Sequence, residues 1–129
     1  MKIYIAGPWV DRKAVNEFSA ILEKAGFEIT HAWWNYEESK NNSSREACDD
    51  LEGVRRADAV VVWNTALSEG KATEQGLAIA WNKPIVCLTP DGFPVKTNIF
   101  HVLDNYVHVS TQEDVVSKLK DIYHKTKIL

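Results

Sequence analysis

Glu74 is the residue of this sequence whose type and position first suggest chemistry. It ends the stretch Ser-Glu-Gly-Lys-Ala-Thr-Glu from Ser68 to Glu74, which follows the wholly apolar run Ala59–Trp63. That order predicts a buried strand, a polar loop and then a helix that carries the carboxylate in its first turns. A carboxylate there lies in the positive end of the helix dipole and tends to stay ionised. In an open α/β sheet this edge is also where ligands bind.

Asp50 is the second candidate, in a helix predicted before that strand. It is one position from Leu51 and four before Val54, so it flanks the predicted buried stripe. The fold rule brings residues 7–9, the start of this helix and the Asn64–Glu74 loop to one edge of the sheet. Paired carboxylates in a cleft can divide roles, one as an ionised nucleophile and one as an acid. Glycosyl transfer through an oxocarbenium-like transition state needs that division.

The elements that must position these residues alternate along the chain. Hydrophobic patterning predicts strands at Lys2–Ala6, Phe27–Trp33, Ala59–Trp63, Pro84–Thr89 and Tyr106–Ser110. It predicts helices at Asp11–Ala25, from Ser44 to Asp58, at Lys71–Trp81 and at Thr111–Lys125, and a short helical piece at Asn98–Leu103. This alternation predicts an α/β fold, a three-layer α/β/α sandwich with a five-stranded parallel sheet, flavodoxin-like. One domain over residues 1–129 is expected.

Several positions carry packing expectations. Ala72, Gly76 and Ala80 recur at helical spacing and are expected to let their helix lie close to the sheet. In the helix that bears Asp50, we expect Ala47, Leu51 and Val54 to mark the buried face. Of Trp33 and Trp34, one is expected in the core and the other is a candidate lid residue.

Composition excludes several classes of function. The chain has 129 residues, 45% hydrophobic and 26% charged, with a net charge of -3 and no basic patch, so no nucleic-acid partner is expected. No signal peptide or membrane span is predicted. Cys48 and Cys87 are spaced as two ordinary thiols, which fits a cytoplasmic protein. The four histidines lack metal-ligand spacing and no Gly-x-Gly-x-x-Gly or Walker-type loop occurs, so neither a metal nor a cofactor is expected.

A set of short motifs resembles one known family. The motifs are Ile3-Tyr4-Ile5-Ala6-Gly7, Trp9, Asp11-Arg12, Asp50-Leu51, Ser68, Glu74-Gln75-Gly76 and Lys83-Pro84. Together they resemble the nucleoside 2-deoxyribosyltransferase family from Ile3 to about Asn98. The resemblance implies an enzyme that exchanges the nucleobase of 2′-deoxynucleosides, with a deoxynucleoside and a free nucleobase as its small-molecule partners. It also implies a homo-oligomer with active sites at subunit interfaces.

The resemblance assigns the catalytic roles. Glu74 matches the family nucleophile, which attacks the anomeric carbon and forms a covalent deoxyribosyl-enzyme. Tyr4 matches a tyrosine that hydrogen-bonds and positions that glutamate. Asp50 matches the carboxylate that holds the nucleobase and helps to protonate it as it leaves.

The expected substrate-binding residues are Gly7, Trp9, Ser68, Gly70 and Asn98. The resemblance implies that Trp9 walls the base site and that Ser68 contacts the 5′ side of the sugar. Asn98 matches a residue that a neighbouring subunit lends to the 5′ end of the substrate.

Plainer roles stay open for single residues. Tyr4 taken alone is typical of a strand core, and Ser68 and Gly70 are typical of turns. Asp50 could be a solvent-facing acid paired with Arg45 or Arg55.

Two other functions stay open. Serine at position 68, where the best-known transferases have aspartate, is similar to the deoxynucleoside 5′-monophosphate N-glycosidases of the same family. Those hydrolases also carry polar and basic residues after the Gly7 position, whereas this chain has Pro8-Trp9-Val10 with Arg12 nearby. A non-catalytic nucleotide-binding sensor on the same fold is the third possibility.

Overall fold

The computed structural model describes residues 1–36, 44–94 and 98–128. Its strands are β1 (Lys2–Ala6), β2 (Glu28–Ile29), β3 (Ala59–Trp63), β4 (Ile85–Leu88) and β5 (Tyr106–Val109). Its α-helices are α1 (Arg12–Lys24), α2 (Ser44–Arg56), α3 (Glu69–Ala80) and α4 (Gln112–Ile128), and its 3-10 turns are η1 (Trp9–Asp11), η2 (Trp33–Asn35) and η3 (Ile99–Val102). The strands form one parallel sheet in the order β2-β1-β3-β4-β5. This is the expected flavodoxin-like sandwich.

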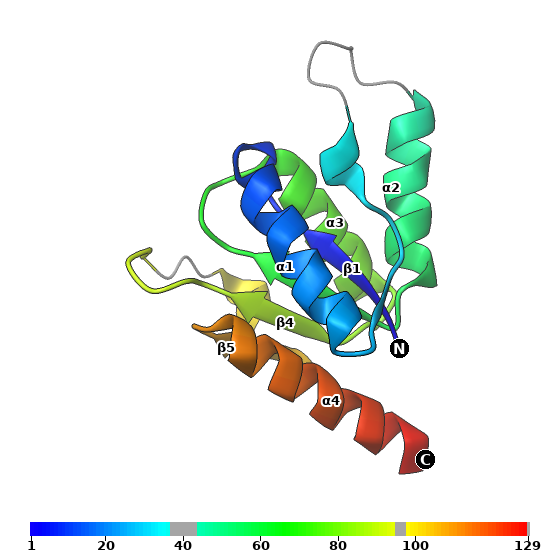
Figure 1. The fold of residues 1–129 in the computed structure, drawn as a ribbon, viewed down its shortest axis with the longest axis vertical. Coiled ribbons are helices and arrows are strands. Elements are labelled where there is room, and N and C mark those ends of the chain that lie inside the picture. The colour runs from blue at the N-terminus through cyan, green and yellow to red at the C-terminus, as the bar shows by residue number, and fades with distance from the viewer. Residues whose placement is uncertain (37–43, 95–97, 129) are drawn as a thin grey trace.

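Helices cover both faces of the sheet (Figure 1). On one face, Phe18 of α1 packs against Trp63 of β3 with ring centroids 5.6 Å apart, and α4 packs on β4. On the other face, α2 and α3 contact each other and β1. All five residues of β3 are buried, as expected for a parallel strand covered on both sides. Gly26, at φ +98°, follows the C-terminus of α1, where this left-handed conformation favours glycine.

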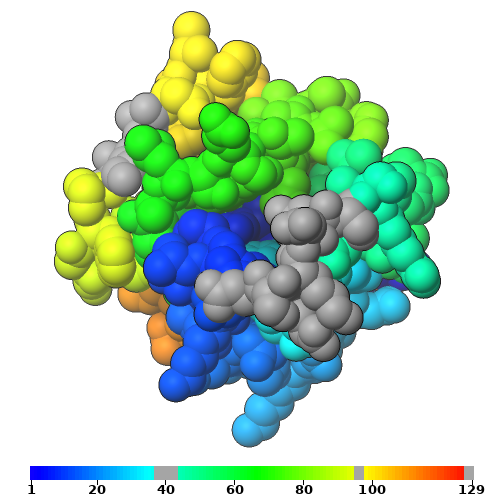
Figure 2. Space-filling view, turned by 90° about the horizontal axis from the view of Figure 1, so that it is seen from above, coloured from blue at the N-terminus to red at the C-terminus, as the bar shows by residue number. Residues whose placement is uncertain are grey.

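The strand order reverses between β1 and β3, which are neighbours in the sheet but not along the chain. The segments that leave these two strands diverge at their carboxyl ends, and such a switch point is where this fold binds ligands. The hydroxyl of Thr65, after β3, donates a hydrogen bond to Asp11, after β1. Figure 2 looks down on this end and shows the surface hollowed between the blue segment after β1 and the green segment that leads into α3.

The inward face of α3 is polar, and the expectation that Ala72, Gly76 and Ala80 pack on the sheet is wrong. All three are exposed. The inward positions are instead Lys71, Gln75 and Ala78, which are buried, and Glu74, which is half-buried. The helix turns this side inward because each polar side chain finds a partner on or beside the sheet. Gln75, for example, accepts a hydrogen bond of 2.7 Å from the Tyr106 hydroxyl of β5.

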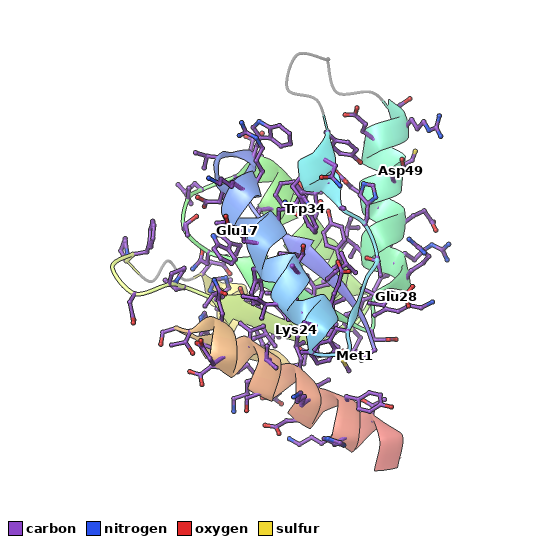
Figure 3. All side chains as sticks on the ribbon, in the orientation of Figure 1. Met1, Glu17, Lys24, Glu28, Trp34 and Asp49 are labelled. Carbon is purple, nitrogen blue, oxygen red and sulfur yellow. The ribbon has the colours of Figure 1, made fainter. Side chains whose placement is uncertain are left out.

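The second strand, β2, and the segment after it also depart from expectation. β2 is only Glu28–Ile29, and η2 begins at Trp33, so the predicted strand ends four residues early. Both Trp33 and Trp34 are buried, so neither is a lid residue. The Trp33 indole nitrogen donates to the Ile5 carbonyl at 2.6 Å, which satisfies its polar atom inside the core. Figure 3 labels Trp34 among the side chains that fill the interior.

The buried face of α2 is Gly53 and Val54, and the expectation that Ala47 and Leu51 share it is wrong, because both are exposed. Gly53 lets the helix approach the sheet closely. A Cβ built at Gly53 would lie 2.8 Å from Cδ2 of Tyr4 and 2.9 Å from Cβ of His31. No side chain fits there without moving the Tyr4 ring or the backbone beside it.

Two further features concern the whole chain. Cys48 is exposed, Cys87 is buried, and both are free thiols. In the ranges 1–36, 44–94 and 98–128, no helix combines the length and the apolarity needed to cross a membrane.

A pair of glycine substitutions tests the packing of α2 and α3. Gly53→Ala should lower the free energy of unfolding by about 1–3 kcal/mol, because the added methyl group overpacks the Tyr4 ring. Gly76→Ala is the matched control, since a Cβ there meets nothing within 4 Å. It should raise the free energy of unfolding by up to about 1 kcal/mol through helix propensity alone. Urea denaturation followed by circular dichroism measures both, and an unchanged Gly53→Ala variant would contradict the close approach.

Candidate active site

Glu74 and Tyr4 form the centre of the candidate site. Glu74 lies six residues after the N-cap Ser68, in the second turn of α3. Tyr4 lies in β1, and its side chain is wholly buried. The Tyr4 hydroxyl donates a hydrogen bond to Oε2 of Glu74. The structure therefore joins these two expected catalytic residues, which are 70 positions apart in the sequence.

The protonation of Glu74 differs from the expectation. Burial raises its pKa to about 8, the Tyr4 hydrogen bond opposes this rise, and the nearby charge of Asp50 adds to it. Desolvation thus favours the protonated form of Glu74, whereas its position near the helix N-terminus alone predicted the ionised form.

Tyr4 acts as a fixed neutral donor. Burial raises the pKa of its hydroxyl far above the ordinary range, and the charges of Glu74 and Asp50 raise it further. A hydroxyl that cannot ionise always has a hydrogen to donate to the carboxylate beside it. Gly53 holds the ring in place from the α2 side.

Asp50 lies on α2 in a different polar group. Its Oδ1 accepts a hydrogen bond of 3.2 Å from the Tyr36 hydroxyl and lies 3.4 Å from Nε2 of His31. Burial raises the pKa of Asp50, while the Tyr36 hydrogen bond and His31 oppose the rise. Neither Arg45 nor Arg55 is its partner in any contact that the structure records, since Arg55 binds Glu52.

His31 and Tyr36 are site residues that the motifs did not identify. Both follow β2 at the carboxyl edge of the sheet, beside the helix that carries Asp50. The fold rule that selected the segments after β1 and β3 applies equally to the segment after β2. Extending that rule to β2 would have included both residues.

Gly7 and Trp9 lie in the segment that follows β1. A Cβ at Gly7 would lie 3.1 Å from Cβ of Trp63, so the backbone passes close to the core there. The Trp9 ring lies under the Arg12 guanidinium, at 4.6 Å from carbon to centroid, and 6.4 Å from the ring of Trp33. Arg12 also donates to the Trp9 carbonyl at 3.1 Å. These contacts fix the position of the indole.

Ser68 and Gly70 belong to the loop that leads into α3. Oγ of Ser68 accepts a hydrogen bond of 3.2 Å from the Lys71 backbone, so Ser68 caps the helix. The buried Lys71 ammonium donates to the Ala66 carbonyl at 2.6 Å and holds this loop down. Gly70 is exposed, and the nearest atom to a Cβ there is Oγ of Ser68 at 3.9 Å.

Asn98 is not brought to the Glu74 group within one chain. It caps η3, where its Oδ1 accepts from the Phe100 backbone at 2.9 Å, and it is exposed. η3 contacts β5, which β3 and β4 separate from β1. Among the described residues, no recorded contact joins Asn98 to Glu74, Tyr4 or Asp50.

The fold and the paired acids at the switch point define a flavodoxin-like α/β protein with a candidate acid–nucleophile site. The chain belongs to the nucleoside 2-deoxyribosyltransferase family, because the model of that family matches residues 3–118. Members of this family act on N-glycosidic bonds. The curated proteins include no match to the chain.

Several solved structures share the fold. A conserved protein from Enterococcus faecalis V583 is 20% identical, with a TM-score of 0.71 and coverage of 94% of this chain and 98% of that one. The Clostridium botulinum CMP N-glycosidase BcmB is 18% identical (TM-score 0.64; 93% and 98%). The 2-deoxyribosyltransferase of Bacillus psychrosaccharolyticus is 20% identical (TM-score 0.68; 90% of each). At these identities the similarity establishes the fold.

The raised pKa of Glu74 predicts how stability depends on pH. The folded protein keeps this proton up to a pKa of about 8, whereas the unfolded chain loses it near 4.5. The resulting stability is present below pH 4.5 and is lost as pH rises through 8. As pH rises between these values, the Tm of a Glu74→Gln variant should therefore increase relative to that of the parent protein, by about 4 °C or more. Thermal unfolding of both proteins at pH 5 and pH 9 measures this, and a constant difference would contradict it.

Proposed function

We propose that the protein is a nucleoside 2-deoxyribosyltransferase that exchanges the nucleobase of 2′-deoxynucleosides through a deoxyribosyl ester of Glu74. The observation that carries the proposal is the hydrogen bond from the buried Tyr4 hydroxyl to Glu74, with Asp50 close enough to raise the pKa of that glutamate. Glu74, positioned by Tyr4, would supply the nucleophile, and Asp50 would supply the acid.

The first half-reaction cleaves the substrate. Ionised Glu74 attacks C1′, and the N-glycosidic bond breaks with its electron pair passing to the base nitrogen. Asp50 donates a proton to the departing base, so the base leaves neutral. Trp9, Gly7 and Gly70 line the space that the substrate fills, and Ser68 contacts its 5′ side.

The second half-reaction restores a nucleoside. A different base attacks C1′ of the ester, the bond to Glu74 breaks, and Asp50 takes the proton from the attacking nitrogen. Two displacements return the β configuration. The absence of a 2′-hydroxyl favours this route, because an electron-withdrawing hydroxyl would destabilise the oxocarbenium-like state.

The burial of Glu74 is consistent with this role. The nucleophilic form is the ionised one, which burial disfavours in the free protein. Positive charge that develops at C1′ stabilises the carboxylate in the transition state, and the Tyr4 hydroxyl stabilises it throughout. The resulting interaction is stronger in the transition state than in the free protein, which is what catalysis requires.

A hydrolase that uses water in the second step is the alternative candidate. Serine at position 68 favours it, and the CMP N-glycosidase BcmB shares the fold. A 5′-monophosphate substrate is less well supported. Arg12, the cation nearest to the first loop, already stacks on Trp9 and donates to its carbonyl.

A homo-oligomer with shared active sites is part of the proposal. Three apolar residues, one in the loop before α3 and two in η3, are strongly exposed: Leu67 is 84% exposed, Ile99 79% and Val102 81%. Exposed apolar clusters of this kind mark protein interfaces. Asn98 lies next to Ile99, so an interface there would carry it to the 5′ end of the substrate in a second subunit.

Product analysis tests the reaction. The protein is incubated with a deoxynucleoside, with and without a second free base, and the nucleosides, bases and sugar are quantified. We expect a new nucleoside when the second base is present. Free sugar alone under both conditions would establish the hydrolase instead. Glu74→Gln should lower turnover at least about 10³-fold, while Glu69→Gln, an exposed acid in the first turn of the same helix, should leave it unchanged. Substrate binding without release of base would indicate the sensor.

Mixing two inactive variants tests the shared site. Glu74→Gln and Asn98→Ala are each expected to be nearly inactive alone. If Asn98 acts in the neighbouring subunit, mixed dimers hold one intact site, so random reassembly should restore about one quarter of the parent activity. Mixtures that stay as inactive as the separate variants would show that Asn98 and Glu74 serve the same chain's site.

A further inference from the structure

Three side chains from neighbouring segments meet around the hydroxyl of Tyr36. Nε2 of His31, after β2, lies 2.5 Å from this oxygen, and Oδ1 of Asp50, on α2, lies 3.2 Å from it. His31 Nε2 is also 3.4 Å from Asp50 Oδ1. The His31 and Asp50 side chains are 22% and 29% exposed. The group is therefore partly buried, with some solvent exposure at both His31 and Asp50.

The chemistry of these groups determines which way the hydrogens point. An ionised carboxylate only accepts, so the Tyr36 hydroxyl donates to Asp50. A hydroxyl has one hydrogen, so the Tyr36 oxygen accepts from Nε2–H of His31. The Glu46 carbonyl, 3.2 Å from the same hydroxyl, is a second acceptor to which the hydroxyl can turn once Asp50 is protonated. Tyr36 thus has a partner in either protonation state of Asp50.

The backbone holds the group in this arrangement. The Thr30 hydroxyl donates to the Gly53 carbonyl of α2 at 2.7 Å, which ties the residue before His31 to the helix that bears Asp50. Since Gly53 has no side chain, the His31 Cβ lies against the helix. The His31 and Tyr36 rings contact each other with centroids 5.5 Å apart.

We infer that His31 and Tyr36 form a proton relay that reprotonates Asp50 when it acts as the acid for the leaving nucleobase; the inference rests on the proposed function. As the C1′–N bond breaks, Asp50 gives its proton to the base. The Tyr36 hydroxyl passes its proton to Oδ1 of Asp50, and Nε2 of a charged His31 gives its proton to the Tyr36 oxygen. His31 becomes neutral and regains a proton from water. When a base attacks, the protons move in the opposite direction.

The surroundings of Asp50 contain other titratable groups. Asp49 and Glu46 face it from its own helix and raise its pKa, and Tyr36 and His31 oppose this rise from the segment after β2. Tyr4 of β1 and Glu74 of α3 complete the set, and Asp50 raises the pKa of each. Loss of Tyr36 or His31 should therefore also raise the pKa of Asp50 and move the alkaline limb of the rate profile to higher pH.

Leaving-group dependence tests the relay. Two deoxyribosides are compared: a nucleoside whose base must be protonated to leave, and a 4-nitrophenyl deoxyriboside whose leaving group needs no proton. Tyr36→Phe and His31→Gln should lower kcat for the nucleoside about 10- to 100-fold and change kcat for the nitrophenyl substrate less than about threefold. Asp50→Asn should show the same selectivity with a larger loss. Glu52→Gln, at an exposed acid of the same helix that pairs with Arg55, should change neither substrate by more than about threefold.

Equal losses on both substrates, or no loss on the nucleoside, would overturn the relay and leave a structural role at most. Failure of the proposed function is a different result, in which Glu74→Gln keeps full activity or the parent protein turns over neither substrate.

A second measurement needs no activity. Two-bond ¹⁵N–¹H NMR correlations identify which nitrogen of neutral His31 carries the hydrogen. The relay requires it on Nδ1, because Nε2 is the nitrogen that gives its hydrogen to the Tyr36 oxygen and takes it back. A hydrogen on Nε2 of the neutral ring would mean that Nδ1 is the nitrogen that loses its proton, so no proton would pass through Tyr36 and the inference would be refuted.

Discussion

The burial of an ionisable glutamate against a buried tyrosine is the constraint on which the rest of this structure depends. Glu74 is removed from water, so its charged form is costly and its pKa rises to about 8. That cost is tolerable because the Tyr4 hydroxyl is always available as a donor. The Tyr4 ring in turn needs a neighbour without a side chain, which Gly53 provides. A single acid–phenol contact thereby determines how closely α2 and α3 approach β1.

The same constraint explains why α3 has a polar inner face. A helix that points Glu74 at the sheet must also turn Lys71, Gln75 and Ala78 inward, because these positions share one side at helical spacing. Buried polar side chains need hydrogen-bond partners, and both Lys71 and Gln75 have one. The Lys71 ammonium donates to the Ala66 carbonyl, and the Gln75 amide oxygen accepts from the Tyr106 hydroxyl. The helix is therefore held by directional hydrogen bonds as well as by apolar contact, which restrains both its rotation and the position of Glu74.

Asp50, the second acid, is held by other segments of the chain than Glu74. Asp50 belongs to α2, and its partners Tyr36 and His31 come from the segment after β2, which Thr30 ties to α2. The two carboxylates thus have different hydrogen-bond partners, with a phenol at one and a phenol–imidazole pair at the other. Environments of this kind separate the roles of two acids at one site, because each group is tuned by its own neighbours. Within the nucleoside 2-deoxyribosyltransferase family, to which this chain belongs, that separation suits an enzyme in which one acid forms a bond and the other moves a proton.

Much of this protein is determined by sequence alone. The wholly apolar run Ala59–Trp63 and the alternation of elements predicted the sheet and its layers, because a strand buried on both faces has few alternatives. Family motifs identified Glu74, Tyr4 and Asp50 as candidates, and the structure brings Tyr4 to Glu74. The tertiary structure decided the rest. Apolar periodicity could not locate a polar inner face on α3, and helix position could not reveal that burial raises the pKa of Glu74. Nor could spacing link His31 to Asp50. Such contacts join residues distant in the chain, and protonation depends on how far each group is removed from water, which only packing determines.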